Sequence, residues 1–174
     1  MFKLLSHLKG SVEGFSEAGL NLDDVLSSPY SYAQRFVKTI GPDRQTRDAF
    51  SITDVLEVDE SCVVKIEGYE KHSRSFFEAC TQVARLMNHM GPVTCHLFKS
   101  PKGACSFPEH TDPDVVIIHL LSGSKLFHNA TGTAITLEAG DFMLIPANYR
   151  HEALNLSDNL MLSIGLESFN TEKL

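Results

Sequence analysis

The sequence predicts a mainly β protein with N-terminal helices (α+β) and a double-stranded β-helix, or jelly-roll, core. The first observation is a series of seven short apolar segments after residue 92, about ten residues apart and separated by Gly, Pro, Ser and Asp. The second is a different residue pattern before residue 92, where two longer segments place apolar residues at helical spacing. Such helices are expected to pack on an outer face of the β core.

Residues 92–174 are expected to form this β core. Each expected strand is rich in β-branched or large apolar residues and is bounded by turn residues. The seven strands are predicted at residues 93–98, 114–121, 124–129, 133–138, 141–147, 151–156 and 159–166.

Residues 1–91 are expected to be mainly helical and to pack on the core within a single compact domain. A first helix is predicted over residues 28–41, with Ser28 as its N-cap. The β-branched segment 62–69 predicts a strand. A second helix is predicted over residues 71–91, with an apolar face made of Phe76, Phe77, Cys80, Val83, Ala84 and Met87.

Composition narrows the class of function. A chain of 174 residues can bury its own core, and a formal net charge of −7 disfavours a nucleic-acid partner, which needs clustered Lys and Arg. No apolar run has the length of a membrane span, and the N-terminal segment lacks a secretory pattern, so we expect a cytoplasmic protein without a membrane partner. The four cysteines form no CxxC pair, which favours reduced thiols over disulfides or a zinc site.

Three residues of the β half have the pattern of a metal site. Residues two apart in a strand point to the same side, so His110 and Asp112 can present an imidazole and a carboxylate to one point. With His151, they match the facial triad of non-haem Fe(II) oxygenases, which leaves open positions on the metal. A manganese or zinc site would use similar residues, so the spacing leaves the metal open. Counting in twos from Asp112 places His119 on the opposite face, where a local hydrogen bond is expected.

Lys125 is a single cation within an apolar hairpin strand. An outward-facing lysine on the surface is one interpretation. The other is a cation at the floor of the barrel, because a buried lysine is costly unless it meets an anion. A dicarboxylate bound to a metal at one end would need such a cation at its other end.

Two longer stretches carry a more specific pattern. The first reads "HLFKSPKGACSFPEHTDPDVVIIHLLSGSK" and the second reads "GDFMLIPANYRHEALNLSDNLMLSIGL". In this order they resemble the JmjC/cupin-like Fe(II)- and 2-oxoglutarate-dependent oxygenases, in particular the ribosomal-oxygenase-like group. The resemblance covers about residues 92 to 166. It implies a jelly-roll cupin core and a dioxygenase, specifically a hydroxylase, that uses Fe(II), 2-oxoglutarate and O₂.

The resemblance also implies roles for individual residues. The iron ligands would be His110, Asp112 and His151. Lys125 would pair with the distal carboxylate of 2-oxoglutarate, and Ser163 would be a second contact. His96 and Phe98 stand where relatives often carry Asn and Tyr, and both would line the cosubstrate pocket. Phe98 cannot donate a hydroxyl, although His96 can donate an N–H.

The substrate and the oligomeric state stay open at this point. A peptide or protein side chain and a small metabolite are both compatible with the resemblance. The short separation of the two motifs and the few residues after the last strand predict neither substrate-binding insertions nor the winged-helix module of ribosomal oxygenases. Two alternatives are a cupin metalloenzyme without 2-oxoglutarate, either an isomerase or a dioxygenase, and a non-catalytic cupin that binds a small acid.

Overall fold

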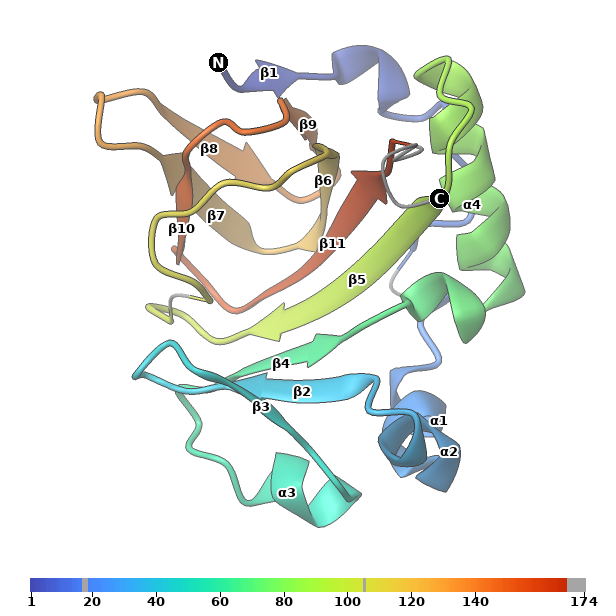
Figure 1. Ribbon diagram of the computed structural model, residues 1–174, viewed down its shortest axis with the longest axis vertical. Helices are drawn as coiled ribbons and strands as arrows, with labels where there is room; N and C mark the ends of the chain where they lie inside the picture. Colours follow the sequence, from blue (N-terminus) through green and yellow to red (C-terminus); the bar gives the residue numbers. More distant parts are fainter. Residues whose placement is uncertain (17–18, 105, 169–174) are drawn as a thin grey trace.

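Two antiparallel β-sheets form the core of the structure, a computed structural model that describes residues 1–16, 19–104 and 106–168 (Figure 1). Across the larger sheet the strands follow the order β1 (Lys3–Leu4), β9 (Phe142–Ile145), β6 (Val115–Ser122), β11 (Asn159–Leu166), β5 (Val93–Ser100), β4 (Val63–Ile66), β2 (Val37–Ile40) and β3 (Thr46–Asp48). The smaller sheet has the order β10 (Glu152–Asn155), β7 (Ser124–His128) and β8 (Ala134–Glu138). One of the four cysteines, Cys105, lies outside the described residues.

The predicted jelly-roll class is confirmed. Each of the seven segments predicted after residue 92 contains a strand, β5 to β11 in chain order. Strand β11 lies between β5 and β6 and pairs with both, so strands distant in the sequence share the middle of the larger sheet. Strand β7 connects β10 and β8 in the smaller sheet, which lies across the interior from β11 (Figure 1).

The N-terminal part supplies strands as well as helices. Its helices are η1 (Ser6–Leu8), α1 (Leu22–Ser27), α2 (Pro29–Ala33), α3 (Ile52–Leu56), η3 (Tyr69–Lys71) and α4 (Arg74–Leu86). Its strands β1 to β4 all join the larger sheet, and β4 pairs directly with β5. The division into residues 1–91 and 92–174 therefore falls at the turn between α4 and β5, and the larger sheet continues across it.

The helix predicted over residues 28–41 is wrong in its length. Helix α2 ends at Ala33, and Arg35 has a φ of 57°, a left-handed conformation that stops a helix. The β-branched segment that follows forms β2, which pairs with β3 and β4. Pairing in the sheet thus overrides the helix signals of Ser28 and Gly41.

Helix α4 covers the outer face of the larger sheet. Phe76, Cys80 and Val83 are buried as predicted and share one hydrophobic cluster with outer-face residues of β5, β6 and β11. Phe77 is 58% exposed, so it does not belong to the apolar face. Because α4 covers this face, the inner face of the same strands is left to line a cavity. Of the helices in the described part of the chain, none has both the length and the apolar character to cross a membrane.

Candidate metal centre and cavity

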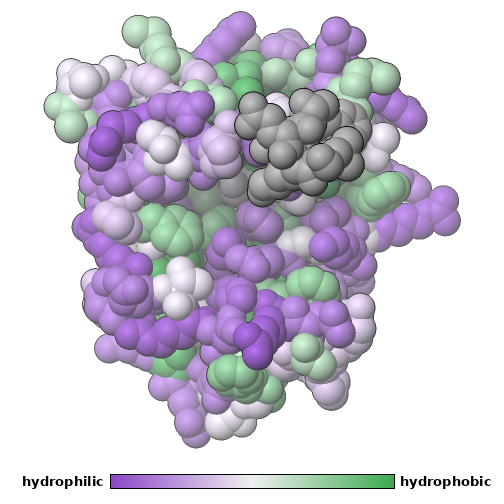
Figure 2. All heavy atoms as spheres, in the orientation of Figure 1, coloured by the Kyte–Doolittle hydropathy of each residue, from purple (hydrophilic) through white to green (hydrophobic). Residues whose placement is uncertain are grey.

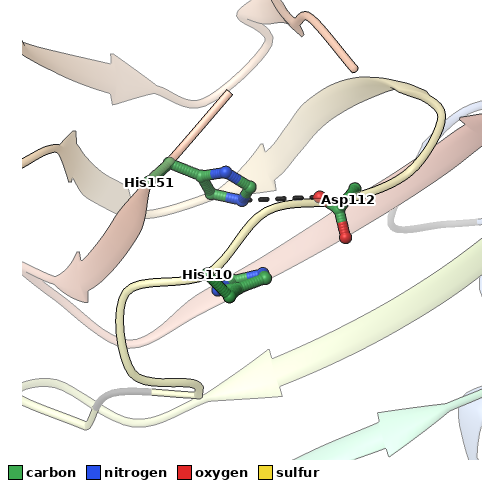
Figure 3. A group of neighbouring side chains, drawn as sticks. All are labelled: His110, Asp112 and His151. Atoms are coloured by element: carbon green, nitrogen blue, oxygen red, sulfur yellow. Dashed lines mark ion pairs between the residues drawn. The ribbon is translucent and has the colours of Figure 1, made fainter. Parts of the chain in front are cut away.

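His110, Asp112 and His151 converge on one point, as Figure 3 shows. The first two lie in the segment before β6, and His151 directly precedes β10. The backbone N–H of His110 donates to the carbonyl of His151 at 3.0 Å, and the reciprocal bond measures 2.9 Å. One potential ligand atom from each residue lies within 4.8 Å of the others. The spacing argument is wrong in one detail, because an isolated bridge and a loop, not a continuous strand, carry His110 and Asp112.

Backbone carbonyls orient both imidazoles. Nδ1 of His110 lies 2.9 Å from the carbonyl oxygen of Pro108, and Nδ1 of His151 lies 2.9 Å from that of Tyr149. A carbonyl only accepts, so each Nδ1 carries the hydrogen and each Nε2 keeps its lone pair for a metal. The Nε2 atom of His151 lies 3.5 Å from Oδ2 of Asp112. These donors form the two-His, one-carboxylate set that holds non-haem iron.

The environment of His151 keeps its ring neutral. Burial lowers the pKa of His151, the hydrogen bond to the Tyr149 carbonyl opposes this, and His110 lowers the pKa further. A neutral imidazole is the form that binds a metal.

A cavity of about 490 Å³ adjoins the three side chains. Its size falls within the range of small-molecule sites, roughly 300–1,000 Å³. Every residue predicted from the sequence to bind metal or cosubstrate lines this cavity: His110, Asp112, His151, Lys125, His96, Phe98 and Ser163. Its apolar walls include Phe107, Val116, Ile118, Phe127, Ala153 and Met161. The surface in Figure 2 is mostly hydrophilic, with apolar side chains visible between the hydrophilic ones.

Strand register brings the sheet residues of the cavity together. Ser163 of β11 lies opposite His96 of β5 on one side and Ile118 of β6 on the other. Met161 lies opposite Phe98. Because residues directly opposite each other in a sheet share a face, these side chains all point to the inner side.

Lys125 is buried, with 1% of its surface exposed, so the interpretation as an outward-facing surface lysine is wrong. It lies on β7 opposite Asn155 of β10. Its Nζ lies 6.0 Å from the centre of the Phe98 ring and 5.9 Å from that of Phe127. The smaller sheet thus presents a cation to the cavity.

His96 is a neutral hydrogen-bond donor. The backbone N–H of Gly68 donates to its Nδ1 at 3.2 Å, so the ring hydrogen is on Nε2. Burial lowers the pKa of His96 to about 4, and the nearby Lys65 contributes in the same direction. The N–H donor expected at this position is therefore available.

Two polar residues of the cavity are missing from the sequence prediction. Lys65 of β4 lines the cavity wall. In the sequence it has the same pattern as Lys125, a charged residue within an apolar strand. Ser106 is 6% exposed, and its hydroxyl has no hydrogen-bond partner among the residues that the structure describes. A serine in a loop gives no sequence signal of this kind.

His119 lies on the opposite face of β6 from the cavity, as predicted. Its Nδ1 lies 3.1 Å from the carbonyl oxygen of Asp141, and its ring stacks on Phe142 at 3.8 Å between centroids. Burial lowers the pKa of His119 to about 4, although the Asp141 carbonyl opposes the shift.

We expect His119 to make the protein less stable in acid. The unfolded chain takes up the proton near the ordinary pKa of 6.5 and the folded chain only near 4, so stability is full above pH 6.5 and falls towards pH 4. At pH 5 the loss amounts to roughly 2 kcal/mol of unfolding free energy. His119→Phe should remove this part of the loss, because the ring can still stack and the Asp141 carbonyl keeps its bond from the Leu120 N–H. Urea unfolding at pH 7 and pH 5 measures the difference; equal pH dependence in both proteins would contradict it.

The comparisons with known proteins agree with this fold. The Cupin domain family (Cupin_2) matches residues 96–165. YcfD, a ribosomal oxygenase from Escherichia coli, has 14% sequence identity and a TM-score of 0.70, over 99% of this chain and 49% of its own. Its complex with cobalt and 2-oxoglutarate gives 15% identity and a TM-score of 0.72, over 99% and 50% of the two chains.

The chain thus spans about half the length of the solved YcfD chains that it matches. A comparison with curated protein sequences gave no match. The family match over residues 96–165 rests on the sequence pattern, whereas the likeness to YcfD rests on the spatial arrangement of the strands. Residues 96–165 therefore match the Cupin domain family, and the chain shares the fold of YcfD.

Proposed function

We propose that the chain is an Fe(II)- and 2-oxoglutarate-dependent dioxygenase that hydroxylates a C–H bond of its substrate. The observation that carries the proposal is a two-His, one-carboxylate cluster at a cavity that also contains a buried ammonium group. The cobalt and 2-oxoglutarate complex of YcfD supports the choice of cosubstrate, because that protein shares the fold.

The metal would be held by Nε2 of His110, Nε2 of His151 and the carboxylate of Asp112. The Nδ1 bonds to carbonyls fix both rings, so the ligands need little rearrangement on binding. When bound, Fe(II) together with 2-oxoglutarate and O₂ supplies the oxidising chemistry, and the protein supplies binding and orientation.

The spacing of the cavity residues suits a dicarboxylate. Lys125 lies opposite Asn155, four residues along the chain from His151, which corresponds to roughly 13 Å of strand. An extended five-carbon diacid, a metal and the lysine side chain together can bridge this distance. Lys125 would pair with the distal carboxylate, while Ser163 and the Nε2–H of His96 offer hydrogen bonds from the facing sheet. The apolar walls would exclude water from this end of the cavity, which strengthens the charge pair.

The substrate would be a peptide or protein side chain or a small metabolite, and the proposed setting is the cytoplasm, without a nucleic-acid or membrane partner. YcfD is named a ribosomal oxygenase, and the described residues that line the cavity of this chain include no feature that selects a ribosomal substrate. The negative net charge disfavours a partner with a phosphate backbone.

Binding and turnover with 2-oxoglutarate test the proposal. Protein loaded anaerobically with Fe(II) is expected to bind one 2-oxoglutarate per chain in a calorimetric titration. In air it should consume 2-oxoglutarate and release succinate in equal amounts, slowly without substrate. Metal binding without any affinity for 2-oxoglutarate would contradict the proposal and favour a cupin metalloenzyme of another class or a non-catalytic acid-binding cupin.

Ser106 is expected to contribute to cosubstrate binding. Asn155, the neighbour of Lys125 across β7 and β10, donates from Nδ2 to the carbonyl of Ala104 at 2.5 Å, which holds the loop before Ser106 near Lys125. The Ser106 hydroxyl can therefore donate to the distal carboxylate of 2-oxoglutarate, which Lys125 would also bind. Ser106→Ala should weaken 2-oxoglutarate binding about ten- to a hundredfold, the effect of losing one hydrogen bond to a charged group. Ser100→Ala, which removes another buried hydroxyl outside the cavity, is the matched control. Equal affinities in both variants would exclude this role.

A further inference from the structure

Lys65 is a second cation of the cavity, to which the proposed function gives no role. It lies on β4 opposite Phe98 of β5. Its neighbours Val64 and Ile66 pack into hydrophobic clusters on the outer face, so Lys65 is directed to the inner face, where it lines the cavity. Its side chain is 14% exposed. An ammonium group this buried is costly unless anions compensate it, so its position needs an explanation.

Glu67 pairs with Lys65 but uses only part of the hydrogen-bonding capacity of its ammonium group. The Lys65 Nζ donates to Glu67 Oε1 at 2.7 Å, and the other oxygen of this carboxylate lies 3.9 Å from the Nζ of Lys38. Burial raises the pKa of Glu67, but the bond from Lys65 and the charges of Lys65 and Lys38 bring it below its ordinary value, so the carboxylate is ionised. Lys38 has a closer partner in Asp48, so Glu67 is mainly the counter-ion of Lys65. Within the described ranges Glu67 is the one hydrogen-bond acceptor of Lys65, and an ammonium group has three donors.

Aromatic rings lie between this ammonium group and the candidate metal ligands. The Lys65 Nζ lies 5.7 Å from the centre of the Phe98 ring and 5.9 Å from that of Phe107. The Phe107 ring in turn contacts the His110 ring edge-on, with 5.4 Å between centroids. A ligand held by Lys65 would therefore rest on Phe107, next to a candidate metal ligand.

The charge balance of the metal and cosubstrate does not involve Lys65. The two positive charges of the metal and the one of Lys125 balance the negative charge of Asp112 and the two of 2-oxoglutarate. Lys65 is thus not needed to neutralise the cosubstrate. It lies on the larger sheet, whereas Lys125 lies on the smaller one, and both approach the Phe98 ring.

We propose that Lys65 forms an anion subsite for a carboxylate of the primary substrate, which is therefore a small organic acid with an apolar body. The inference rests on the proposed function. The acid group would bind the ammonium hydrogens that Glu67 does not use, and the apolar body would pack on Phe98 and Phe107. This arrangement directs a C–H bond of the acid towards the cluster of His110, Asp112 and His151.

Matched pairs of acids and amides test the subsite by calorimetry. The probes are hexanoate and 3-phenylpropanoate, each beside its neutral amide, titrated anaerobically into protein that carries Co(II) and saturating 2-oxoglutarate. The acids are expected to bind and the amides to bind much more weakly. Lys65→Met should weaken acid binding roughly thirtyfold to several thousandfold, as loss of one partner of a charge pair does, and should leave 2-oxoglutarate binding unchanged. Lys99→Met, which removes an exposed ammonium group from β5 outside the cavity, should behave like the wild type.

Several results would overturn the proposal. Acids and amides that bind equally, no binding of either acid, or wild-type acid affinity in Lys65→Met would each exclude the subsite. Weaker 2-oxoglutarate binding in Lys65→Met would make Lys65 a cosubstrate contact instead. If Lys65→Met does not fold, Lys65→Gln provides the same comparison, because it keeps a donor for Glu67 and removes the charge. If the wild type binds no 2-oxoglutarate, the proposed function fails, and the acid titration of protein with Co(II) alone still decides the subsite.

Discussion

His110→Ala and Asp112→Ala are each expected to abolish the binding of one Fe(II) per chain without unfolding the protein. Each substitution removes one of three donors whose ligand atoms already lie within 4.8 Å of one another. Two remaining donors form an incomplete site with low affinity for a divalent metal. Both residues are only half-buried and belong to the segment before β6, so their loss should change the melting temperature little. Anaerobic titration with Fe(II), together with a melting curve of each variant, measures both effects.

Two controls make this result specific. Asp114→Ala removes a carboxylate two residues from Asp112 that accepts from the N–H of Ser168 and does not line the cavity. His89→Ala removes an imidazole at the turn after α4, where its Nε2 lies 3.1 Å from the Pro92 carbonyl oxygen. Both controls should bind iron like the wild type. Retained iron binding in His110→Ala or Asp112→Ala would show that the metal ligands lie elsewhere.

The sequence predicts the β half of this fold well because its signals are local. Each strand after residue 92 has its own apolar run and its own turn residues, and these need no information from the rest of the chain. The segment that forms β2 is different, because helix signals at Ser28 and Gly41 enclose it. It becomes a strand because β4 offers a partner, and that partner lies more than twenty residues further along the chain. Long-range pairing of this kind has no local signature.

Prediction of the candidate site from the sequence has the same limit. His110 and Asp112 are recognisable because they are close in the sequence, and His151 because its flanking motif is distinctive. Whether Lys125 faces inward depends on the register of β7 with β10, which the sequence leaves open. A surface lysine is therefore equally compatible with the sequence. Lys65 has the same pattern within an apolar strand, but no family motif surrounds it, and only the pairing of β4 with β5 brings it to the cavity.

Lys125→Met is expected to raise the dissociation constant of 2-oxoglutarate roughly thirtyfold to several thousandfold. Methionine keeps the length of the apolar stem and removes the charge that would pair with the distal carboxylate. Loss of one partner of a desolvated charge pair costs roughly 2–5 kcal/mol, and burial of Lys125 at 1% exposure makes this range appropriate. Iron binding should stay nearly unchanged, because the ligands are intact. Lys125→Arg should retain part of the affinity, although its planar fork has a different reach.

The two lysine variants together separate the roles that the cavity suggests. Lys125→Met should lose 2-oxoglutarate affinity in calorimetry and keep the preference for acids over amides in protein with Co(II) alone. Lys65→Met should show the reverse, because its ammonium group lies on the opposite sheet and pairs with Glu67. A melting curve for each variant establishes that the fold is intact. Unchanged 2-oxoglutarate affinity in a folded Lys125→Met protein would remove the cosubstrate assignment, and the cavity would then be that of a cupin that uses its metal without 2-oxoglutarate.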